Sequence, residues 1–333
     1  MNLKNKRIII IHSGSELKID DADTILQANE INNCLKKLGL DSSLEQIDDL
    51  KIIQKISNYD KEKTVIFNLV ESFNGSDSKS YQFTALLDCF KIPYSGANSA
   101  FLLLASDKII TKQILKSGGI KTPKWLESKN ANNKKLPDKY IVKSTTEHCS
   151  LGIDDNSVSD KNILSIIEEK QKQYGGIWFA EEYIDGREFN ISVMEIDGKP
   201  IIMPLAETIF KNNHNQKHKI VDYSAKWHGE DEAYNDYGRS FIYDKKDQKL
   251  LKNIEKTSLK VWKLFKMNNY VRIDFRIDKN NKIFVIDINA NPCLASDAGF
   301  IAATQEYGLS QEDTLINILK NSLNICFAKN LFV

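Results

Sequence analysis

The sequence predicts an α/β protein composed of more than one packed unit. Its 333 residues exceed the size at which one hydrophobic core usually serves a whole chain. In residues 7–96, apolar strands alternate with amphipathic helices, a pattern typical of a small parallel α/β unit. Two later runs, 271–277 and 283–289, alternate apolar and polar residues with period two and predict a β-hairpin.

Composition places the chain among ordinary globular proteins. Hydrophobic residues make up 41% and charged residues 27% of the chain, which is the usual balance. A net charge of +1 gives no overall field that would attract nucleic acid or an anionic membrane. No apolar run approaches the roughly 18 residues that span a bilayer, and Ile8–Ile11 is too short for a signal-peptide core. Five scattered cysteines without a CxxC pair indicate reduced thiols, so we expect a cytoplasmic protein without nucleic-acid or membrane partners.

The N-terminal region is expected to form a parallel sheet with flanking helices. Its elements, in order, are strand 7–11, helix 24–38, helix 47–57, strand 64–70, helix 78–90 and a short strand at 92–96. Gly39 is a natural C-cap for the first helix. The first strand runs into His-Ser-Gly-Ser rather than GxGxxG, so dinucleotide binding has no support.

The central and C-terminal elements follow from the same periodicities. They are two helical stretches within 98–119, strand 140–143, helix 160–173, strands 177–184, 188–196 and 201–206, helix 247–266 and helix 313–324. Asp197-Gly198 is a hairpin signal. Lys108 and Lys112 lie one turn apart on the second helical stretch and suit either phosphate binding or a solvated face. Residues 128–135 predict a flexible connector, and 211–246 predict a long loop of the kind that is usually functional or disordered.

The predicted hairpin gathers polar groups on one side of its sheet. A turn at 280–281 pairs Asp274 with Asp287 and Arg272 with Asn289. The opposite side is predicted to hold Ile273, Phe275, Phe284, Ile286 and Ile288.

Two carboxylates that face each other across a strand pair repel and need neutralisation. A neighbouring arginine, protonation of one aspartate or a divalent cation could each provide it. The oxygen set of Asp274, Asp287 and Asn289 suits Mg²⁺ or Mn²⁺, which prefer hard ligands. The alternative is an exposed polar face paired with Arg272 and Arg276.

A series of short motifs, each weak alone, appears in the order found in a known family. The motifs are Tyr81-Gln82, Ile92 to Gly96, Ser106-Asp107-Lys108, Thr122-Pro123, Val142-Lys143, Ser150 to Ile153, Glu181 to Glu188, Asp222 to Trp227, Arg272 to Phe275 and Asp287 to Pro292. Together they resemble the ATP-grasp ligases, most closely the D-alanine–D-alanine ligase family. The resemblance implies an ATP-grasp fold with an N-terminal parallel α/β domain (1–103), a central α+β lid domain (104–185) and a C-terminal metal-binding domain (186–333).

The resemblance also implies an ATP and metal site. The residues expected at ATP are Lys108, Lys143 and Lys226 at the phosphates, Ser150 and Gly152 in a loop over the triphosphate, Glu181 at the adenine amino group, Glu182, Tyr183 and Ile184 in the hinge, and Glu188 at the ribose. Asp274, Asp287 and Asn289 are expected to hold two Mg²⁺ ions, with Mn²⁺ as the other candidate. Arg272 would stabilise a tetrahedral oxyanion, and Ser150 and Lys226 complete the catalytic set.

The implied reaction joins a small-molecule carboxylate to an amine. The carboxylate attacks the γ-phosphorus of ATP to give an acyl phosphate and ADP, and the amine then displaces phosphate. Such catalysis depends on positioning and charge neutralisation. The resemblance implies amino acids as the substrates, and a homodimer is the assembly considered.

Several positions depart from the family pattern. Cys293 and Ala298 stand where the family usually has Gly and Ser contacts to the second substrate's carboxylate. Cys149 replaces a usual Ser, Ser144 a usual Pro, and Asp287 a more frequent Glu.

The first loop departs as well, because the segment 12–24 has no clear equivalent of the family's ammonium-binding Glu. Glu16 or an aspartate from 20–23 would have to substitute. We therefore expect an amino-acid or dipeptide ligase with an altered substrate pocket. The alternatives are D-alanine–D-alanine ligase proper in cell-wall synthesis, a non-catalytic ATP-binding regulatory protein, and phosphoryl transfer to an acid without amide formation.

Overall fold

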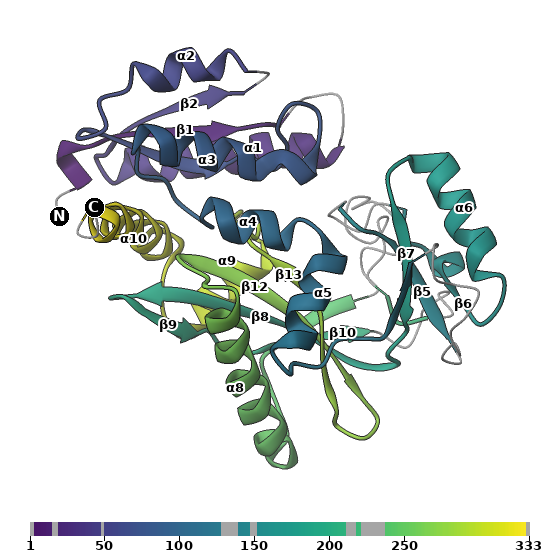
Figure 1. The fold of residues 1–333 in the computed structure, drawn as a ribbon. Helices are drawn as coiled ribbons and strands as arrows, with labels where there is room; N and C mark the ends of the chain where they lie inside the picture. Colours follow the sequence, from purple (N-terminus) through teal and green to yellow (C-terminus); the bar gives the residue numbers. More distant parts are fainter. Residues whose placement is uncertain are drawn as a thin grey trace.

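A computed structural model describes residues 3–14, 19–47, 50–127, 139–146, 152–210, 218–220 and 237–330. These residues form three separate sheets with helices packed on them (Figure 1). The sheets are three-stranded (β2-β1-β3), four-stranded (β4-β7-β5-β6) and six-stranded (β11-β10-β8-β12-β13, with β9 beside β8). Within the described ranges, no helix is long and apolar enough to cross a membrane.

The first sheet is parallel and buried on both faces. It consists of β1 (Arg7–His12), β2 (Asp41–Gln46) and β3 (Thr64–Leu69), with α1 (Ile19–Lys37), α2 (Ile52–Ser57) and α3 (Ser80–Phe90) packed around it. Ile8 and Ile10 belong to one core cluster and Ile9 and Ile11 to another. A central parallel strand covered on both faces requires such a continuous apolar run.

Strand β2 was not predicted from the sequence. Its residues, Asp-Ser-Ser-Leu-Glu-Gln, are mostly polar because β2 is an edge strand that is largely half-buried. The helix expected at 47–57 is consequently shorter and begins at Ile52. The end of α1 follows expectation, because Gly39 adopts a φ of +72° just beyond it, a conformation that glycine takes without strain.

The second sheet carries one helix of its own. It contains β4 (Trp125–Glu127), β5 (Tyr140–Ser144), β6 (Val158–Ser159) and β7 (Trp178–Glu182), and α6 (Ile163–Tyr174) lies against it. All three of its strand pairings are antiparallel. Ile163 and Ile167 of α6 pack on Trp178, which fixes the helix over the strands.

The six-stranded sheet is the largest and is antiparallel throughout. Its strands are β8 (Gly186–Ile196), β9 (Lys199–Ile202), β10 (Ala206–Phe210), β11 (Tyr237–Ser240), β12 (Tyr270–Asp278) and β13 (Ile283–Asn289). The strand expected at 201–206 is thus two strands, separated by Met203–Leu205. The β8–β9 hairpin turns at Asp197 and Gly198, both with positive φ, as the sequence predicted.

Helices cover this sheet on both faces. Helices α4 (Ser99–Ala105), α5 (Lys108–Ser117) and α8 (Gln248–Leu264) share the hydrophobic core on one face, whereas α9 (Gly299–Tyr307) and α10 (Gln311–Asn330) belong to the core beside the first sheet. Asp107 caps α5, because its Oδ1 accepts from the N–H groups of Ile109 at 2.7 Å and Ile110 at 3.1 Å. Aspartate is one of the residues preferred at this position of a helix. Short 3₁₀ turns occur at Leu3–Asn5, Asp77–Lys79, Asp155–Ser157 and Lys245–Asp247.

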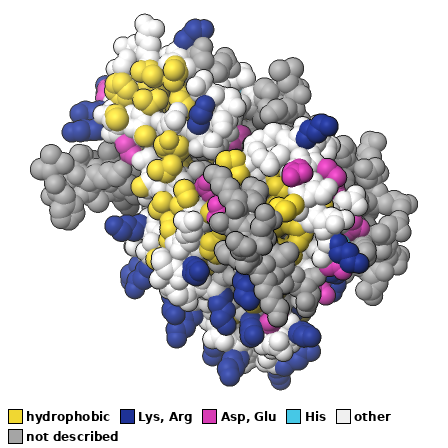
Figure 2. Space-filling model, turned by 45° about the vertical axis from the view of Figure 1, so that its right-hand side comes forward, with side chains coloured by type: hydrophobic (Ala, Val, Ile, Leu, Met, Phe, Trp, Pro, Cys, Tyr) yellow, Lys and Arg dark blue, Asp and Glu magenta, His cyan; other side chains and the backbone are white. Residues whose placement is uncertain are grey.

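Helix α8 presents a basic outer face. Its lysines lie opposite the buried residues Leu250, Ile254 and Val261, and Figure 2 shows Lys and Arg side chains gathered over the lower part of the molecule. This is the solvated side of an amphipathic helix.

The hairpin β12–β13 has the predicted pairing at its polar end. Arg272 faces Asn289 and Asp274 faces Asp287. The turn differs from expectation, because Asp278 N–H donates to Lys282 O and Asn281 has positive φ. The turn therefore has one residue more than predicted, and a β-bulge after Asp274 restores the register.

The bulge corrects the predicted apolar face. Phe275 pairs with Val285 rather than with Ile286, and Arg276 pairs with Phe284. Val285 consequently enters the core, whereas Phe284 and Ile286 do not belong to it. The extra residue in β13 reverses the alternation of sides on the turn side of the bulge.

Candidate functional site

The polar face of the hairpin is organised around the carboxylate of Asp274. Arg272 donates to it from Nε at 2.8 Å and from Nη2 at 2.9 Å. Two amide groups complete the set, because Asn190 Nδ2 lies 2.9 Å from Oδ1 and Asn289 Nδ2 lies 3.0 Å from Oδ2. Each oxygen of this buried carboxylate thus accepts two hydrogen bonds. The arginine considered as a neutralising partner for Asp274 is therefore in place.

Arg272 is a permanent cation at the centre of this face. Burial alone would lower the pKa of its guanidinium, but Asp274, and then Asp287, raise the pKa above the ordinary value. A planar guanidinium that binds a carboxylate through two parallel N–H groups forms a strong, geometrically specific ion pair. Because Nε and Nη2 face Asp274, the Nη1 edge is the one that can donate elsewhere.

Asp287 and Asn289 complete the oxygen set on β13. Asp287 accepts the N–H of Ile288 at 3.0 Å, and Asn289 uses its NH₂ group on Asp274, which directs its carbonyl oxygen away from that carboxylate. The described residues include no cluster of three or more His, Cys, Asp or Glu side chains placed to hold a metal. Two carboxylates and one amide still fit Mg²⁺, which takes few protein ligands and completes its shell with water and phosphate oxygens.

A second group, buried between α5 and the four-stranded sheet, consists of one carboxylate and two amines. Glu181 on β7 binds Lys143 of β5 at 2.7 Å and also contacts Lys112 of α5. Lys112 donates further to Thr122 Oγ1 at 2.9 Å. Burial would raise the pKa of Glu181, but the two lysines outweigh it and hold that pKa below its usual range.

The sequence left the role of Lys112 open between phosphate binding and a solvated face. The structure shows that the solvated-face interpretation is wrong. Its side chain is only 2% exposed. Lys108, one turn earlier, is buried as well, and its backbone N–H donates to Thr145 O at 2.9 Å. The spacing of the two lysines on an amphipathic helix was the signal available, but only the fold shows that Lys112 faces Glu181.

Tyr183 and Glu188, expected at the hinge and ribose, lie next to Arg276. Arg276 Nη2 binds Glu188 Oε2 at 2.6 Å, and its guanidinium lies 5.9 Å from the centre of the Tyr183 ring. The described segment 218–220 joins the same group, because Arg276 also donates to Lys219 O and Lys219 N–H donates to Tyr183 Oη at 3.1 Å. The segment 218–220 therefore contacts the six-stranded sheet through Arg276, and its Ile220 packs with Ile141 and Val158 of the four-stranded sheet.

The remaining expected ATP residues are placed as follows. Gly152 has a φ of +66°, and a Cβ there would lie 2.7 Å from the Trp178 ring, so the position requires glycine. Glu182 pairs with Tyr140 in the sheet, and Ile184 is buried. Ser150 and Lys226 lie outside the described residues.

The buried group around Glu181 and the polar face of the hairpin interact electrostatically. Asp287 contributes to raising the pKa of Lys143, after the larger effect of Glu181 and against burial. Since Lys143 and Asp287 come from different sheets, the fold brings the expected phosphate and metal residues within electrostatic range of each other.

The turn after the hairpin is held by α1. Leu294 N–H donates to Gln27 Oε1 and Ser296 N–H to Glu30 Oε2, while Cys293 Sγ lies 3.9 Å from Asp23 Oδ2. Burial first, with nearby carboxylates, raises the pKa of the Cys293 thiol to about 12. This thiol is therefore protonated at neutral pH. The sequence did not reveal that α1 supports this turn.

The three sheets and the meeting of buried lysines with a carboxylate hairpin define the class of ATP-grasp ligases. Solved structures agree on the fold: a D-alanine–D-alanine ligase from Bacillus anthracis superposes with a TM-score of 0.73 at 20% identity, covering 97% of this chain and 99% of its own. The D-alanyl-alanine synthetase A from Vibrio cholerae gives 0.73 at 16% identity, with 96% and 99% covered. The expected fold is thereby confirmed.

Residues 112–320 match the family model described as D-ala D-ala ligase C-terminus, and the chain belongs to this family. Among curated relatives, the D-alanine–D-alanine ligase of Carboxydothermus hydrogenoformans is 28% identical, covering 78% of this chain and 82% of its own length. That of Pseudothermotoga lettingae is 26% identical, covering 90% and 94%. The expected class, an ATP-dependent, ADP-forming C–N ligase, is confirmed.

Proposed function

We propose that this protein joins an amino acid or dipeptide to an amine through an acyl phosphate, in a substrate pocket altered from that of D-alanine–D-alanine ligases. The observation that carries the proposal is the placement of Asp287, which faces Asp274 on the hairpin, within electrostatic range of the largely buried Lys143. Carboxylates alone would repel ATP, whereas carboxylates with metal ions and lysines accommodate its phosphates.

The ATP contacts proposed from the resemblance are compatible with the described geometry. Lys108 and Lys143 would bind phosphates, and Lys112 joins them as a buried cation beside Lys143. Glu188 would meet the ribose from its position beside Arg276. Glu181, proposed for the adenine, is bound to lysines here, so one of its ion pairs would have to lengthen when ATP binds. The roles of Ser150, Gly152 and Lys226 rest on the resemblance.

The proposed metal ligands are Asp274, Asp287 and Asn289. Asp287 and the carbonyl oxygen of Asn289 would serve as ligands, and Asp274 would exchange an amide partner for the metal. We propose two Mg²⁺ ions, with Mn²⁺ as a substitute. When bound, they would neutralise phosphate charge.

The protein's own groups would then act by position and charge. Arg272, held side-on by Asp274, would donate from Nη1 to the oxyanion that forms when the amine nitrogen attacks the acyl carbon. Phosphate leaves with the former carboxylate oxygen. Arg276 and Tyr183, tied to Lys219, would hold the two sheets together around the nucleotide.

Substrate choice would be set near the turn after Pro292. Cys293 is a protonated side chain beside Asp23, and it lies where the family usually has a carboxylate-binding glycine. The curated relatives are named for D-alanine, so D-alanine–D-alanine ligation in cell-wall synthesis is the second candidate. Cytoplasmic location, a homodimer, absence of nucleic-acid and membrane partners, and domain boundaries near 103 and 185 are further parts of the proposal.

The deciding experiment is incubation with Mg-ATP and pooled D- and L-amino acids, followed by ADP measurement and mass spectrometry of products. The proposal expects ADP release together with a condensed product other than D-alanyl-D-alanine alone. D-alanyl-D-alanine as the sole product would favour the second candidate. ADP release that needs no amine would indicate phosphoryl transfer, and the absence of turnover with intact nucleotide binding would indicate a regulatory protein.

A further inference from the structure

A chain of polar contacts runs across the six-stranded sheet to Asp274. Thr208 on β10 donates from Oγ1 to Asn190 Oδ1 at 2.9 Å. Asn190 on β8 donates from Nδ2 to Asp274 Oδ1 at 2.9 Å. Asn190 lies directly opposite Asp274 in the β8–β12 register, and all three side chains are on the same face of the sheet as Arg272.

Thr208 determines which end of the Asn190 amide faces Asp274. A side-chain amide has a donor end and an acceptor end, and only the donor end is attractive to a carboxylate. The hydroxyl proton of Thr208 satisfies the acceptor end, so the NH₂ group is directed at Asp274. Thr208 and Asp274 are both buried, where an unsatisfied or repulsive contact costs more than it would in water.

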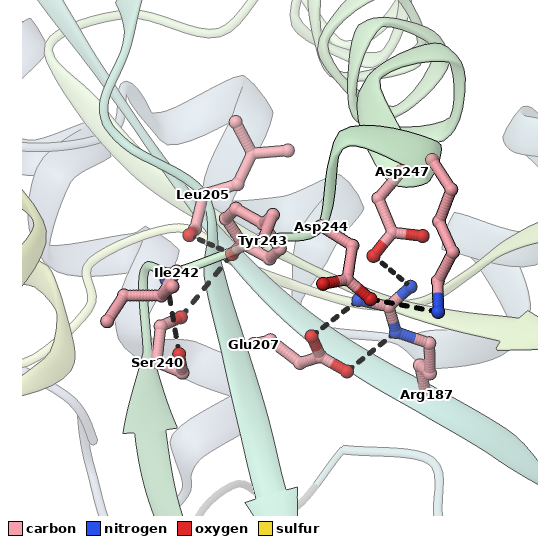
Figure 3. A network of polar contacts seen from close by, with 9 residues as sticks. Arg187, Leu205, Glu207, Ser240, Ile242, Tyr243, Asp244 and Asp247 are labelled. Carbon is pink, nitrogen blue, oxygen red and sulfur yellow. Dashed lines mark hydrogen bonds and ion pairs between the residues drawn. The ribbon is translucent and has the colours of Figure 1, made fainter.

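On the opposite face of the sheet, ion pairs of Arg187 join β8 to β10. Arg187, next to Glu188 on β8, donates to Glu207 of β10 from Nε at 2.7 Å and from Nη2 at 2.6 Å. It also binds Asp247 beside α8 at 3.0 Å. Figure 3 shows the Arg187 guanidinium between the two carboxylates, beside the Tyr243 contacts. Since Glu207 directly precedes Thr208, this clamp holds Thr208 within reach of Asn190.

We propose that Asn190 and Thr208 are positioning residues for the metal site, an inference that rests on the proposed function. They hold the carboxylate of Asp274 in place. Its Oδ1 accepts from Asn190 and from Arg272 Nε, and its Oδ2 accepts from Arg272 Nη2 and from Asn289. Because Asn190 is not itself a proposed ligand, it can keep Asp274 oriented while Oδ2 exchanges the Asn289 amide for the metal. Such outer contacts to metal ligands commonly change affinity by about 10–100-fold.

The test measures Mn²⁺ binding by the electron paramagnetic resonance signal of free Mn²⁺, with a non-hydrolysable ATP analogue present. Thr208→Val keeps the shape and removes the hydroxyl, and we expect Mn²⁺ affinity to fall about tenfold. Thr208→Ser keeps the donor and should restore affinity to the wild-type value. Asn190→Ala, which removes the direct contact, should match Thr208→Val. Nucleotide affinity without metal should be unchanged in all three.

Thr257→Val is the matched control, because the Thr257 hydroxyl donates within its own helix α8, to Asn253 O at 2.7 Å, and this variant should bind Mn²⁺ like the wild type. Wild-type Mn²⁺ affinity in both Thr208→Val and Asn190→Ala would overturn this inference and leave the proposed metal site intact. A Thr208→Ser variant as weak as Thr208→Val would do the same. If the wild type bound no Mn²⁺ with the nucleotide, the proposed metal site itself would fail together with the inference.

Discussion

Replacing Glu181 by Gln would test the buried charge group most severely. The change keeps the size of the side chain and removes the only carboxylate that contacts both Lys112 and Lys143 in the described structure. The side chain of Lys112 is 2% exposed and that of Lys143 is 13% exposed, so water could not solvate the two ammonium groups well enough to compensate for the lost carboxylate. Two ammonium groups would then share one buried site.

The expected loss of stability is large. Removing one partner from a buried ion pair typically costs about 3–5 kcal/mol because the other charge is left uncompensated. The lysines lower the pKa of Glu181 in the folded protein below its ordinary value of 4.5. Its contribution is therefore fully present above that ordinary value and is lost as pH falls through the folded pKa. The Glu181→Gln variant should lack this part of the acid dependence.

Urea unfolding at pH 7, with and without Mg-ATP, measures the effect. We expect the variant to lose about 3–5 kcal/mol without nucleotide and to gain more from ATP than the wild type, because phosphates would supply the missing negative charge. Glu169→Gln on the exposed face of α6 is the control and should be neutral. A Glu181→Gln variant as stable as the control would refute the reasoning.

Three further predictions concern single residues. Arg272→Lys should lower turnover much more than ATP affinity, because an ammonium cannot keep the side-on contact with Asp274 and also donate to an oxyanion. Steady-state kinetics and a nucleotide titration measure the two effects. Equal losses of turnover and ATP affinity would contradict the role assigned to Arg272. Gly152→Ala should weaken ATP binding and lower the melting temperature, since its Cβ would lie 2.7 Å from the Trp178 ring at positive φ; an unchanged melting temperature would be inconsistent with this geometry. The Cys293 thiol, whose pKa is raised to about 12, should react with iodoacetamide at pH 8 far more slowly than the exposed Cys89. Peptide mass spectrometry measures both rates. Comparable rates would show that the Cys293 thiol is not protected.

The pairing at the polar end of the hairpin could be predicted because side-chain alternation fixes register strongly where one face is buried. Asp274 does face Asp287, and Arg272 does face Asn289. The longer turn and the bulge were not predictable, because each shifts the pairing by one residue and together they cancel at Asp274. Only Phe284 and Ile286, which lie between the two irregularities or at the bulge, were assigned to the wrong side.

Contacts between distant segments were the part that sequence could not supply. Lys112 looks like a surface residue by its type and spacing, and its partner Glu181 lies on a different element. Strand β2 is polar because only one of its edges is paired. The Thr208–Asn190 contact joins two strands whose local patterns carry no sign of it. Local periodicity predicts which side chains are buried, but it does not identify the residues that they contact.

The most direct test of the central claim is the transfer of an oxygen atom. A carboxylate substrate labelled with ¹⁸O should be incubated with Mg-ATP and its amine partner, and the released phosphate should be analysed by mass spectrometry. An acyl-phosphate mechanism predicts that each phosphate carries one oxygen from the carboxylate, because the amine displaces phosphate at carbon. Phosphate that carries no label, with amide product formed, would contradict the claim.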